Sequence, residues 1–252
     1  MNFEPELLLA VETSLDICSV ALFRSSQLAE EHAFRHNMHL SERLMGSIDT
    51  ILKSTGLEIA QIDAFACGVG PGSFTGTRIG VMTVKMIASL LVKPVVGVGS
   101  LEAVAARYTG LKDSLIVPML PCRSGIVYSA AFEVDKQEPT CKMDPSALAI
   151  TDLVTKLTDL SHRRIVFCGK SANRFEEELR DALPSCDLSF GSHFYADAAE
   201  VGRIGLERLR SGNPHSEAID LLPDYISPPP ITMPKVPIPI ENKNHLPGSQ
   251  YI

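Results

Sequence analysis

The segment from Gly68 to Gly80, GVGPGSFTGTRIG, has the residue types and spacing in this sequence that best suit ligand chemistry. Its glycines let the backbone approach a ligand closely, and amides at a helix N-terminus attract a phosphate. It is not a P-loop, because Thr77 and Arg78 stand where Gly-Lys-Ser/Thr would follow. A tight turn that needs glycine for packing explains the segment equally well. The sequence predicts one of these two roles.

Ser73 lies inside this segment and could be considered as a nucleophile. A hydrolase would place the serine in a G-x-S-x-G elbow, but Phe74 and Thr75 separate Ser73 from Gly76. A structural or ligand-touching serine is therefore favoured. The residues expected near a nucleotide or phosphate are Glu12, Thr13, Ser14, Gly70, Gly72, Ser73, Thr75, Gly76 and Arg78.

Three further side chains could serve a metal or proton transfer. Glu12 closes the first apolar run, where it would be either a catalytic or metal-facing carboxylate or a turn residue. His36 and His39 are spaced i, i+3, as metal ligands sometimes are. No Cys or carboxylate cluster joins the two histidines, so solvent-facing positions near a helix start are favoured. No metal site is predicted.

Alternating strands and helices must position these residues. In the first half, apolar runs and helical spacing predict strands at Leu7 to Val11, Ile17 to Phe23, Leu28 to Phe34, Ala64 to Val69 and Pro94 to Val98, with helices from Leu40 to Gly56, from Ile79 to Leu91 and after Ser100. In the second half they predict strands at Leu115 to Val117, Gly125 to Val134 and Arg164 to Cys168, with helices at Thr151 to Leu160, Asn173 to Leu183 and Asp197 to Arg210.

This alternation predicts an α/β protein with mixed sheets flanked by helices. We expect two domains, residues 1–100 and 101–226. Residues 227–252 are rich in proline without periodicity, and we expect a disordered tail there, either passive or recognising a partner.

Composition narrows the classes of function. The 252 residues are 45% hydrophobic, which suits a folded core, and the net charge of −7 argues against a freestanding nucleic-acid surface. Six scattered cysteines without a C-x-x-C pair favour a reduced, cytoplasmic protein. The apolar stretch from Ile79 to Val98 contains Lys85, Lys93 and Pro94, so no membrane span is expected.

Three blocks resemble the bacterial TsaB (YeaZ) family: LLLAVETSLDICSVALF, HLSERLMGSIDTIL and GVGPGSFTGTRIGVMTVKMIASLLVKPVVGVGSLEAVA. The resemblance extends over about residues 6 to 226. It implies an actin-like (ASKHA) fold of two ribonuclease-H-like domains. It also implies a dimerization subunit of the complex that forms threonylcarbamoyladenosine next to the anticodon of tRNAs reading codons that begin with A.

The resemblance carries further expectations. The partners would be a TsaD-type catalytic subunit and a TsaE-type ATPase, with tRNA bound through the complex only and a homodimer of the isolated chain left open. TsaD-type metal ligands are replaced here by the segment Ser100 to Val104, SLEAV, so this chain is not expected to catalyse the transfer itself. No cofactor is expected to be tightly bound, although ATP or ADP could lie at the shared interface.

The helix from Ile79 to Leu91 is apolar on nearly all sides, which suggests that a second subunit covers part of it. Complete burial by its own sheet is the alternative. The expected partner interface comprises Leu44, Ile48, Ile51, Ile79, Met82 and Met86. A rival function is a small-molecule kinase or ATPase of the actin-like fold, but its second phosphate loop would have to be Phe167 to Ala172, which has a single glycine.

Overall fold

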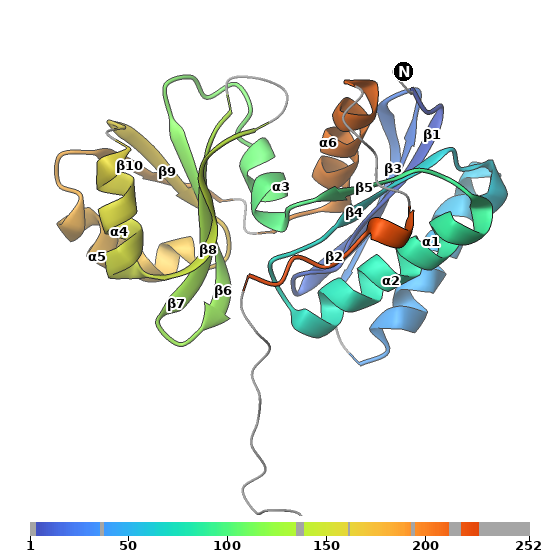
Figure 1. Ribbon diagram of the computed structural model, residues 1–252, viewed down its shortest axis with the longest axis horizontal. Helices are drawn as coiled ribbons and strands as arrows, with labels where there is room; N and C mark the ends of the chain where they lie inside the picture. Colours follow the sequence, from blue (N-terminus) through green and yellow to red (C-terminus); the bar gives the residue numbers. More distant parts are fainter. Residues whose placement is uncertain are drawn as a thin grey trace, which may run out of the picture.

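The computed structural model describes residues 4–35, 38–134, 139–160, 162–192, 195–211 and 218–226. Two lobes lie side by side, each built on a five-stranded sheet flanked by helices (Figure 1). The predicted α/β class with mixed sheets is confirmed. His36 and the predicted tail at 227–252 lie outside the described residues. In the part of the chain that is described, no helix combines the length and hydropathy needed to cross a bilayer.

The first sheet has the strand order β3-β2-β1-β4-β5. Its central strand pairs antiparallel with β2 and parallel with β4. The elements of this lobe are β1 (Leu7–Glu12), β2 (Ile17–Arg24), β3 (Gln27–Arg35), α1 (Leu40–Thr55), η1 (Ile59–Gln61), β4 (Ala64–Gly68), α2 (Phe74–Leu91) and β5 (Val95–Val98).

The second sheet has the order β10-β9-β6-β7-β8 and repeats the topology of the first. Its central strand, β6, again pairs antiparallel with the next strand and parallel with the fourth. Its elements are β6 (Leu115–Arg123), β7 (Ile126–Glu133), β8 (Thr140–Ala149), α4 (Ile150–Asp159), β9 (Arg164–Cys168), η2 (Ala172–Phe175), α5 (Glu176–Ala182) and β10 (Asp187–Phe190). The chain therefore contains one mixed-sheet unit twice.

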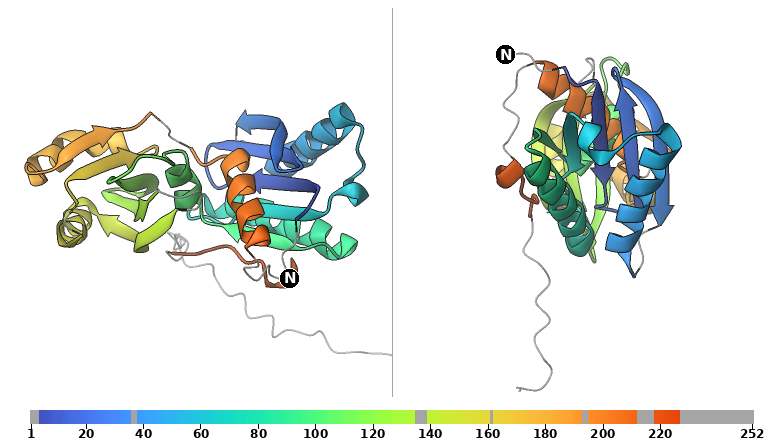
Figure 2. Two further views of the ribbon diagram at one scale, coloured as in Figure 1. Left: turned by 90° about the horizontal axis from the view of Figure 1, so that it is seen from above. Right: turned by 90° about the vertical axis from the view of Figure 1, so that its right-hand side faces the viewer.

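Two helices, α3 (Ser100–Ala106) and α6 (Ala198–Arg210), lie between the two sheets (Figures 1 and 2). Alternate residues of β1 serve opposite faces, so Leu8 packs toward α6 and Leu9 packs toward α1 and α2. Close approach of α6 requires Gly205, where a Cβ would lie 2.8 Å from that of Ala66. The structure thus places α6, which the prediction assigned to residues 101–226, against the first sheet.

The last described segment also returns to the first lobe. It contains η3 (Ala218–Asp220) and continues to Ile226, and we call residues 218–226 the strap. Leu221 of the strap is buried in the core between the first sheet and α1 and α2. The strap and α6 together bring both ends of the chain's described part to the same lobe.

Candidate functional site between the lobes

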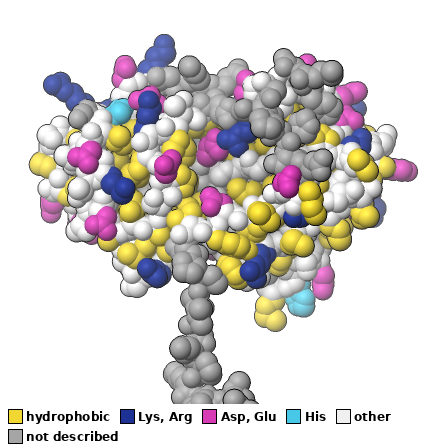
Figure 3. Space-filling model, viewed as in Figure 1, with side chains coloured by type: hydrophobic (Ala, Val, Ile, Leu, Met, Phe, Trp, Pro, Cys, Tyr) yellow, Lys and Arg dark blue, Asp and Glu magenta, His cyan; other side chains and the backbone are white. Residues whose placement is uncertain are grey.

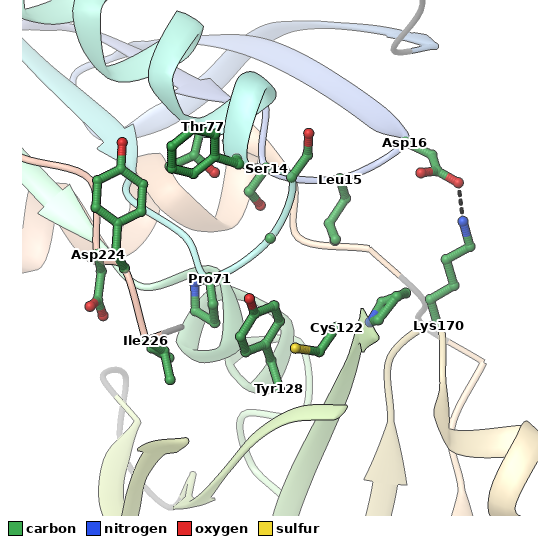
Figure 4. A pocket seen from close by; sticks show the side chains of 15 residues that line it. Ser14, Leu15, Asp16, Pro71, Thr77, Cys122, Tyr128, Lys170, Asp224 and Ile226 are labelled. Carbon is green, nitrogen blue, oxygen red and sulfur yellow. Dashed lines mark hydrogen bonds and ion pairs between the residues drawn. The ribbon is translucent and has the colours of Figure 1, made fainter. Parts of the chain in front are cut away.

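A cavity of about 320 Å³ opens between the two lobes at the glycine-rich loop (Figure 4). The first lobe contributes the β1–β2 loop and the start of α2, the second lobe contributes the ends of β6 and β7, and the strap contributes its last residues. The lining residues are Ser14, Leu15, Asp16, Pro71, Gly72, Ser73, Phe74, Thr77, Pro121, Cys122, Tyr128, Lys170, Asp224, Tyr225 and Ile226.

The glycine-rich loop packs directly against the β1–β2 loop. A Cβ at Gly72 would lie only 2.2 Å from the carbonyl oxygen of Ser14, and the amide of Ser73 donates a hydrogen bond to the same oxygen at 2.6 Å. The hydroxyl of Ser73 caps α2 by accepting a hydrogen bond from the amide of Gly76 at 3.2 Å. Two of the loop amides that could hold a phosphate are therefore used inside the chain.

The carboxyl of Glu12 lies fully buried behind this loop. It accepts hydrogen bonds from the amide of Ser14 at 2.5 Å and from the hydroxyl of Ser100 at 3.0 Å, and Ser14 Oγ donates to Ser100 Oγ at 2.8 Å. Burial raises the pKa of Glu12, and these hydrogen bonds offset part of the rise. A Cβ at Gly68 would overlap the Glu12 carboxylate, so this glycine makes room for it.

The predicted nucleotide-proximal residues divide into two groups. Ser14, Gly72 and Ser73 line the cavity, whereas Thr13 is buried and donates a hydrogen bond to the Gly76 carbonyl at 2.8 Å. Thr75 is exposed. Glu12, Gly70, Gly76 and Arg78 are also not among the lining residues.

Sequence reasoning missed several lining residues that come from distant parts of the chain. Lys170, after β9, forms an ion pair with Asp16 at one edge of the cavity (Figure 4). Tyr128 and Asp224 line it from β7 and from the strap. No local motif marks these residues, because they meet only when the two lobes and the strap assemble.

The structure describes no group of three His, Cys, Asp or Glu side chains that could hold a metal within its residue ranges. Ser100 and Val104, which the resemblance leads us to expect in place of TsaD-type metal ligands, are both buried. The hydroxyl of Ser100 is hydrogen-bonded to Glu12, and Val104 belongs to the core between the lobes. These two positions are built into the packing of the chain.

Half of the predicted partner interface needs correction. Leu44, Ile48 and Ile51 are buried in the core, because the apolar face of α1 packs on the first sheet. They cannot line an open surface. Ile79 is partly buried against the same core.

The remaining two predicted interface residues lie on the surface. Met82 is 59% exposed and Met86 is 55% exposed, and Leu90 continues the same ridge along α2. On α1, Met45 is the large apolar side chain that remains exposed, at 45%. Hydrophobic side chains gather along the lower right of the molecule, over α2, in Figure 3. We call Met82, Met86 and Leu90 the α2 ridge.

Two lobes of one mixed-sheet topology with a cavity between them define the actin-like class of proteins, as predicted. Over 88% of this chain and all of the other, the fold superposes on a Pseudomonas aeruginosa protein described as similar to peptidase YeaZ, with a TM-score of 0.76 and 22% identity. A second Pseudomonas aeruginosa structure, described as YeaZ, superposes with a TM-score of 0.71.

Sequence comparison gives the family. The family model described as "TsaD: tRNA N6-adenosine threonylcarbamoyltransferase" matches residues 35–193, more than half of the chain. The chain belongs to this family.

Curated relatives agree with this assignment. "tRNA threonylcarbamoyladenosine biosynthesis protein TsaB" of Bacillus subtilis is 26% identical over 87% of this chain and 93% of its own length. The proteins of the same name from Haemophilus influenzae and Escherichia coli are 39% and 31% identical. These two alignments span 51% and 56% of the relatives and 48% and 51% of this chain.

Proposed function

We propose that this chain is a non-catalytic, activating subunit in the formation of threonylcarbamoyladenosine in tRNA, and that it pairs with a TsaD-type catalytic subunit. The names of the TsaB relatives support the pathway. The net charge of −7 supports binding of tRNA through the complex and not through this chain alone. We also propose a TsaE-type ATPase as a further partner of this chain.

The observation that carries the pairing is the α2 ridge. Met82 and Met86 expose more than half of their surface, although methionines in soluble chains usually pack inside. The ridge follows one side of a helix of 18 residues, so a partner helix can lay its own apolar face along it. Thioether side chains adapt their shape to such a contact.

The contacts of Ser73 support a structural role for this residue and not a role as a nucleophile. Its hydroxyl accepts the cap hydrogen bond of α2, and no histidine is among the residues of the described part of the chain that line the cavity. A serine with no base at hydrogen-bond distance is a weak nucleophile at neutral pH. ATP or ADP at the shared interface is part of the proposal, since the cavity opens beside the glycine-rich loop.

Co-purification with the TsaD-type subunit of the same cell tests the pairing. We expect a complex with wild-type chain that Met82→Glu abolishes, because the substitution places a charge on the ridge, while the melting temperature of the isolated chain is retained. Leu28→Glu is the matched control, because Leu28 is 43% exposed on the edge strand β3. Met86→Glu serves as a second ridge variant.

Two outcomes would contradict the proposal. Wild-type chain that neither co-elutes with the TsaD-type subunit nor raises threonylcarbamoyl transfer to tRNA would remove its basis. Turnover of ATP by the purified chain alone would instead support the small-molecule kinase or ATPase alternative.

A further inference from the structure

A second cavity, of about 350 Å³, lies next to the first one between the lobes. It is bordered by the first residues of α3, by β8 and by the end of α6. Pro71 of the glycine-rich loop and Asp224 of the strap line both cavities, so these two residues form the wall between them. Figure 4 shows both residues, together with Ile226, at the edge of the first cavity. We call the last strap residues, 224–226, the plug.

The plug is held by a few contacts near the surface. The amide of Asp224 donates a hydrogen bond to the carbonyl oxygen of Val69 at 2.8 Å. Arg78 Nε donates to the hydroxyl of Tyr225 at 2.7 Å, and the centre of the Tyr225 ring lies 5.1 Å from that of Phe74. Tyr225 is nevertheless 43% exposed. Because segments with few buried contacts open at low free energy, the plug can leave while the rest of the fold stays intact.

The earlier part of the strap is anchored more firmly. Leu221 is buried in the core of the first lobe. Lys85 Nζ of α2 donates hydrogen bonds to the carbonyl oxygens of Ile219 at 2.5 Å and Leu221 at 3.2 Å. Pro223 lies between these anchors and the plug. The strap therefore has a fixed part and, beyond Pro223, a part that depends on its own few contacts.

The plug lies beside a buried hydroxyl that has no partner. Thr77, on the first turn of α2, lines the first cavity and is 3% exposed, and its Oγ1 has no hydrogen-bond partner among the described residues. A Cβ at Gly70 would lie 3.4 Å from both Thr77 Cγ2 and the carbonyl oxygen of Asp224, so this side chain is next to the plug. Burying an unpaired hydroxyl costs free energy. The closed arrangement thus leaves a polar group that a ligand could satisfy.

The start of α2 offers further donors to the same region. The amides of Phe74 and Thr75 are the first two of the helix and have no acceptor within it. Together with the Thr77 hydroxyl they stand at the positive end of the dipole of an 18-residue helix. Donors in this position favour an oxyanion as the ligand.

Displacement of the plug changes the charge of the first cavity. Its charged lining residues are Asp16, Lys170 and Asp224, and Asp16 forms an ion pair with Lys170. With the plug in place, the Asp224 carboxylate makes this set negative, which disfavours an anion. Without the plug, the ion pair is balanced and the N-terminus of α2 is the remaining polar field. Glu12 lies behind the loop and lines neither cavity.

The second cavity stays acidic in either state. Glu102 and Arg208 form an ion pair at 2.5 Å, which leaves the carboxylate of Asp144 unbalanced there. An oxyanion therefore belongs in the first cavity, and only an uncharged part of a ligand is compatible with the second.

We propose that the plug covers a binding site for a phosphoryl oxyanion at the N-terminus of α2, and that the ligand and the plug exclude each other. This inference goes beyond the proposed function, because it concerns the isolated chain and needs no partner subunit. A site that is open in only a fraction of the molecules binds its ligand more weakly by that fraction. Loosening the plug therefore tightens the apparent affinity without adding a contact to the ligand.

Titration calorimetry of the full chain with inorganic pyrophosphate tests the site. Tyr225→Ala removes the acceptor of Arg78 and the ring beside Phe74, so it should tighten the apparent affinity about tenfold. Leu222→Ala is the matched control and should bind like the wild type, because Leu222 is 67% exposed and lies outside the plug. Tyr225→Phe, which removes only the hydroxyl, replaces Tyr225→Ala if that variant does not fold.

Thr77→Val separates binding from stability. Added to Tyr225→Ala, it should weaken pyrophosphate binding about tenfold, as expected for a lost hydrogen bond to a charged group. Its melting temperature should not fall, because the lost hydroxyl has no partner among the described residues. A merely structural role of Thr77 would give the reverse result.

Alkylation of Cys122 reports on the plug without any ligand, since Cys122 lines the first cavity. Peptide mass spectrometry after iodoacetamide treatment should show faster labelling of Cys122 in Tyr225→Ala than in the wild type. Cys186, which lines neither cavity, should keep its rate.

Each outcome decides one part of the inference. An unchanged labelling rate of Cys122 in Tyr225→Ala would overturn the plug. Faster labelling without tighter pyrophosphate binding would overturn the oxyanion site. Titrations with ADP and adenosine identify the source of the phosphoryl group: tighter binding of ADP than of pyrophosphate indicates a nucleotide, and equal binding indicates the phosphoryl group alone. Adenosine that binds as tightly as ADP would overturn the assignment of an oxyanion.

Discussion

The hydroxyl of Ser100 donates a hydrogen bond to Oε2 of Glu12 at 3.0 Å, and both side chains are fully buried. One residue ends β1 and the other begins α3, so this contact joins the first sheet to the helix between the lobes. The carboxyl has hydroxyl and amide partners here, and burial raises its pKa.

Because of this raised pKa, we predict that ionisation of Glu12 lowers the free energy of unfolding of the wild-type chain as the pH rises. Because the folded state favours the protonated form, Glu12 contributes stability below its ordinary pKa of 4.5, and this contribution is lost as the pH rises. Glu12→Gln cannot ionise. Its melting temperature relative to wild type should therefore be higher at pH 8 than at pH 5.

The control for that comparison is Glu42→Gln, which removes a carboxylate whose side chain is exposed on the first turn of α1. Glu31 and Glu200, whose pKa values are also raised by burial, are present in all three chains and cancel in the comparison. An unchanging difference between Glu12→Gln and wild type across this pH range would contradict the prediction.

Gly72 should not tolerate a side chain. Alanine there would place its Cβ 2.2 Å from the Ser14 carbonyl oxygen, which is backbone and cannot swing away. We expect Gly72→Ala to lower the free energy of unfolding by about 2 kcal/mol or more, in the range of steric strain in packed sites. Gly46→Ala, in open space on α1, should raise it by about 0.5 to 1 kcal/mol, as urea unfolding would show.

Ser73 should matter for stability more than for chemistry. Ser73→Ala removes the cap of α2 and should cost about 1 kcal/mol in unfolding free energy. Threonylcarbamoyl transfer in the reconstituted complex should remain near the wild-type rate. Ser73→Asn keeps a capping side chain without the hydroxyl and should restore the stability. If Ser73→Ala abolished transfer as fully as omission of the chain, a catalytic serine would follow.

Two adjacent residues on α1 should respond to truncation with losses of very different size. Leu44 is completely buried, so Leu44→Ala should lower the free energy of unfolding by about 2 to 5 kcal/mol. Met45 is exposed, so Met45→Ala should change it by less than about 0.5 kcal/mol. Similar losses of unfolding free energy in both variants, measured by denaturant titration, would contradict the placement of Leu44 in the core and Met45 on the surface.

Most of the strands and helices could be predicted from the sequence, because their apolar spacing reflects burial directly. The apolar pattern predicts no strand between Val134 and Thr151, yet β8 runs from Thr140 to Ala149 there. The strand β10 was also missed. Both are edge strands, and an edge strand keeps few buried residues and tolerates proline. The helix α2 begins at Phe74 and not at Ile79, because the cap of Ser73 starts it before the apolar pattern does.

The glycine-rich segment and Glu12 could be found from residue types alone, since glycine spacing and a strand-ending carboxylate are local signals. The use of the loop could not, because the Ser14 carbonyl that occupies the space beside Gly72 belongs to another loop. The ion pair of Asp16 and Lys170 joins residues 154 positions apart. Such contacts depend on how the two lobes assemble.

The partner surface shows the same division most clearly. The sequence determined that α1 and α2 each carry many apolar residues, and that in α2 these residues occupy nearly all sides of the helix. It could not distinguish Leu44 and Ile48, which cover the chain's own sheet, from Met82 and Met86, which remain exposed. An apolar stripe has the same helical period whether it packs on its own sheet or on another chain. Only the tertiary structure decided which stripe was already covered, because burial depends on the orientation of each helix against the sheet.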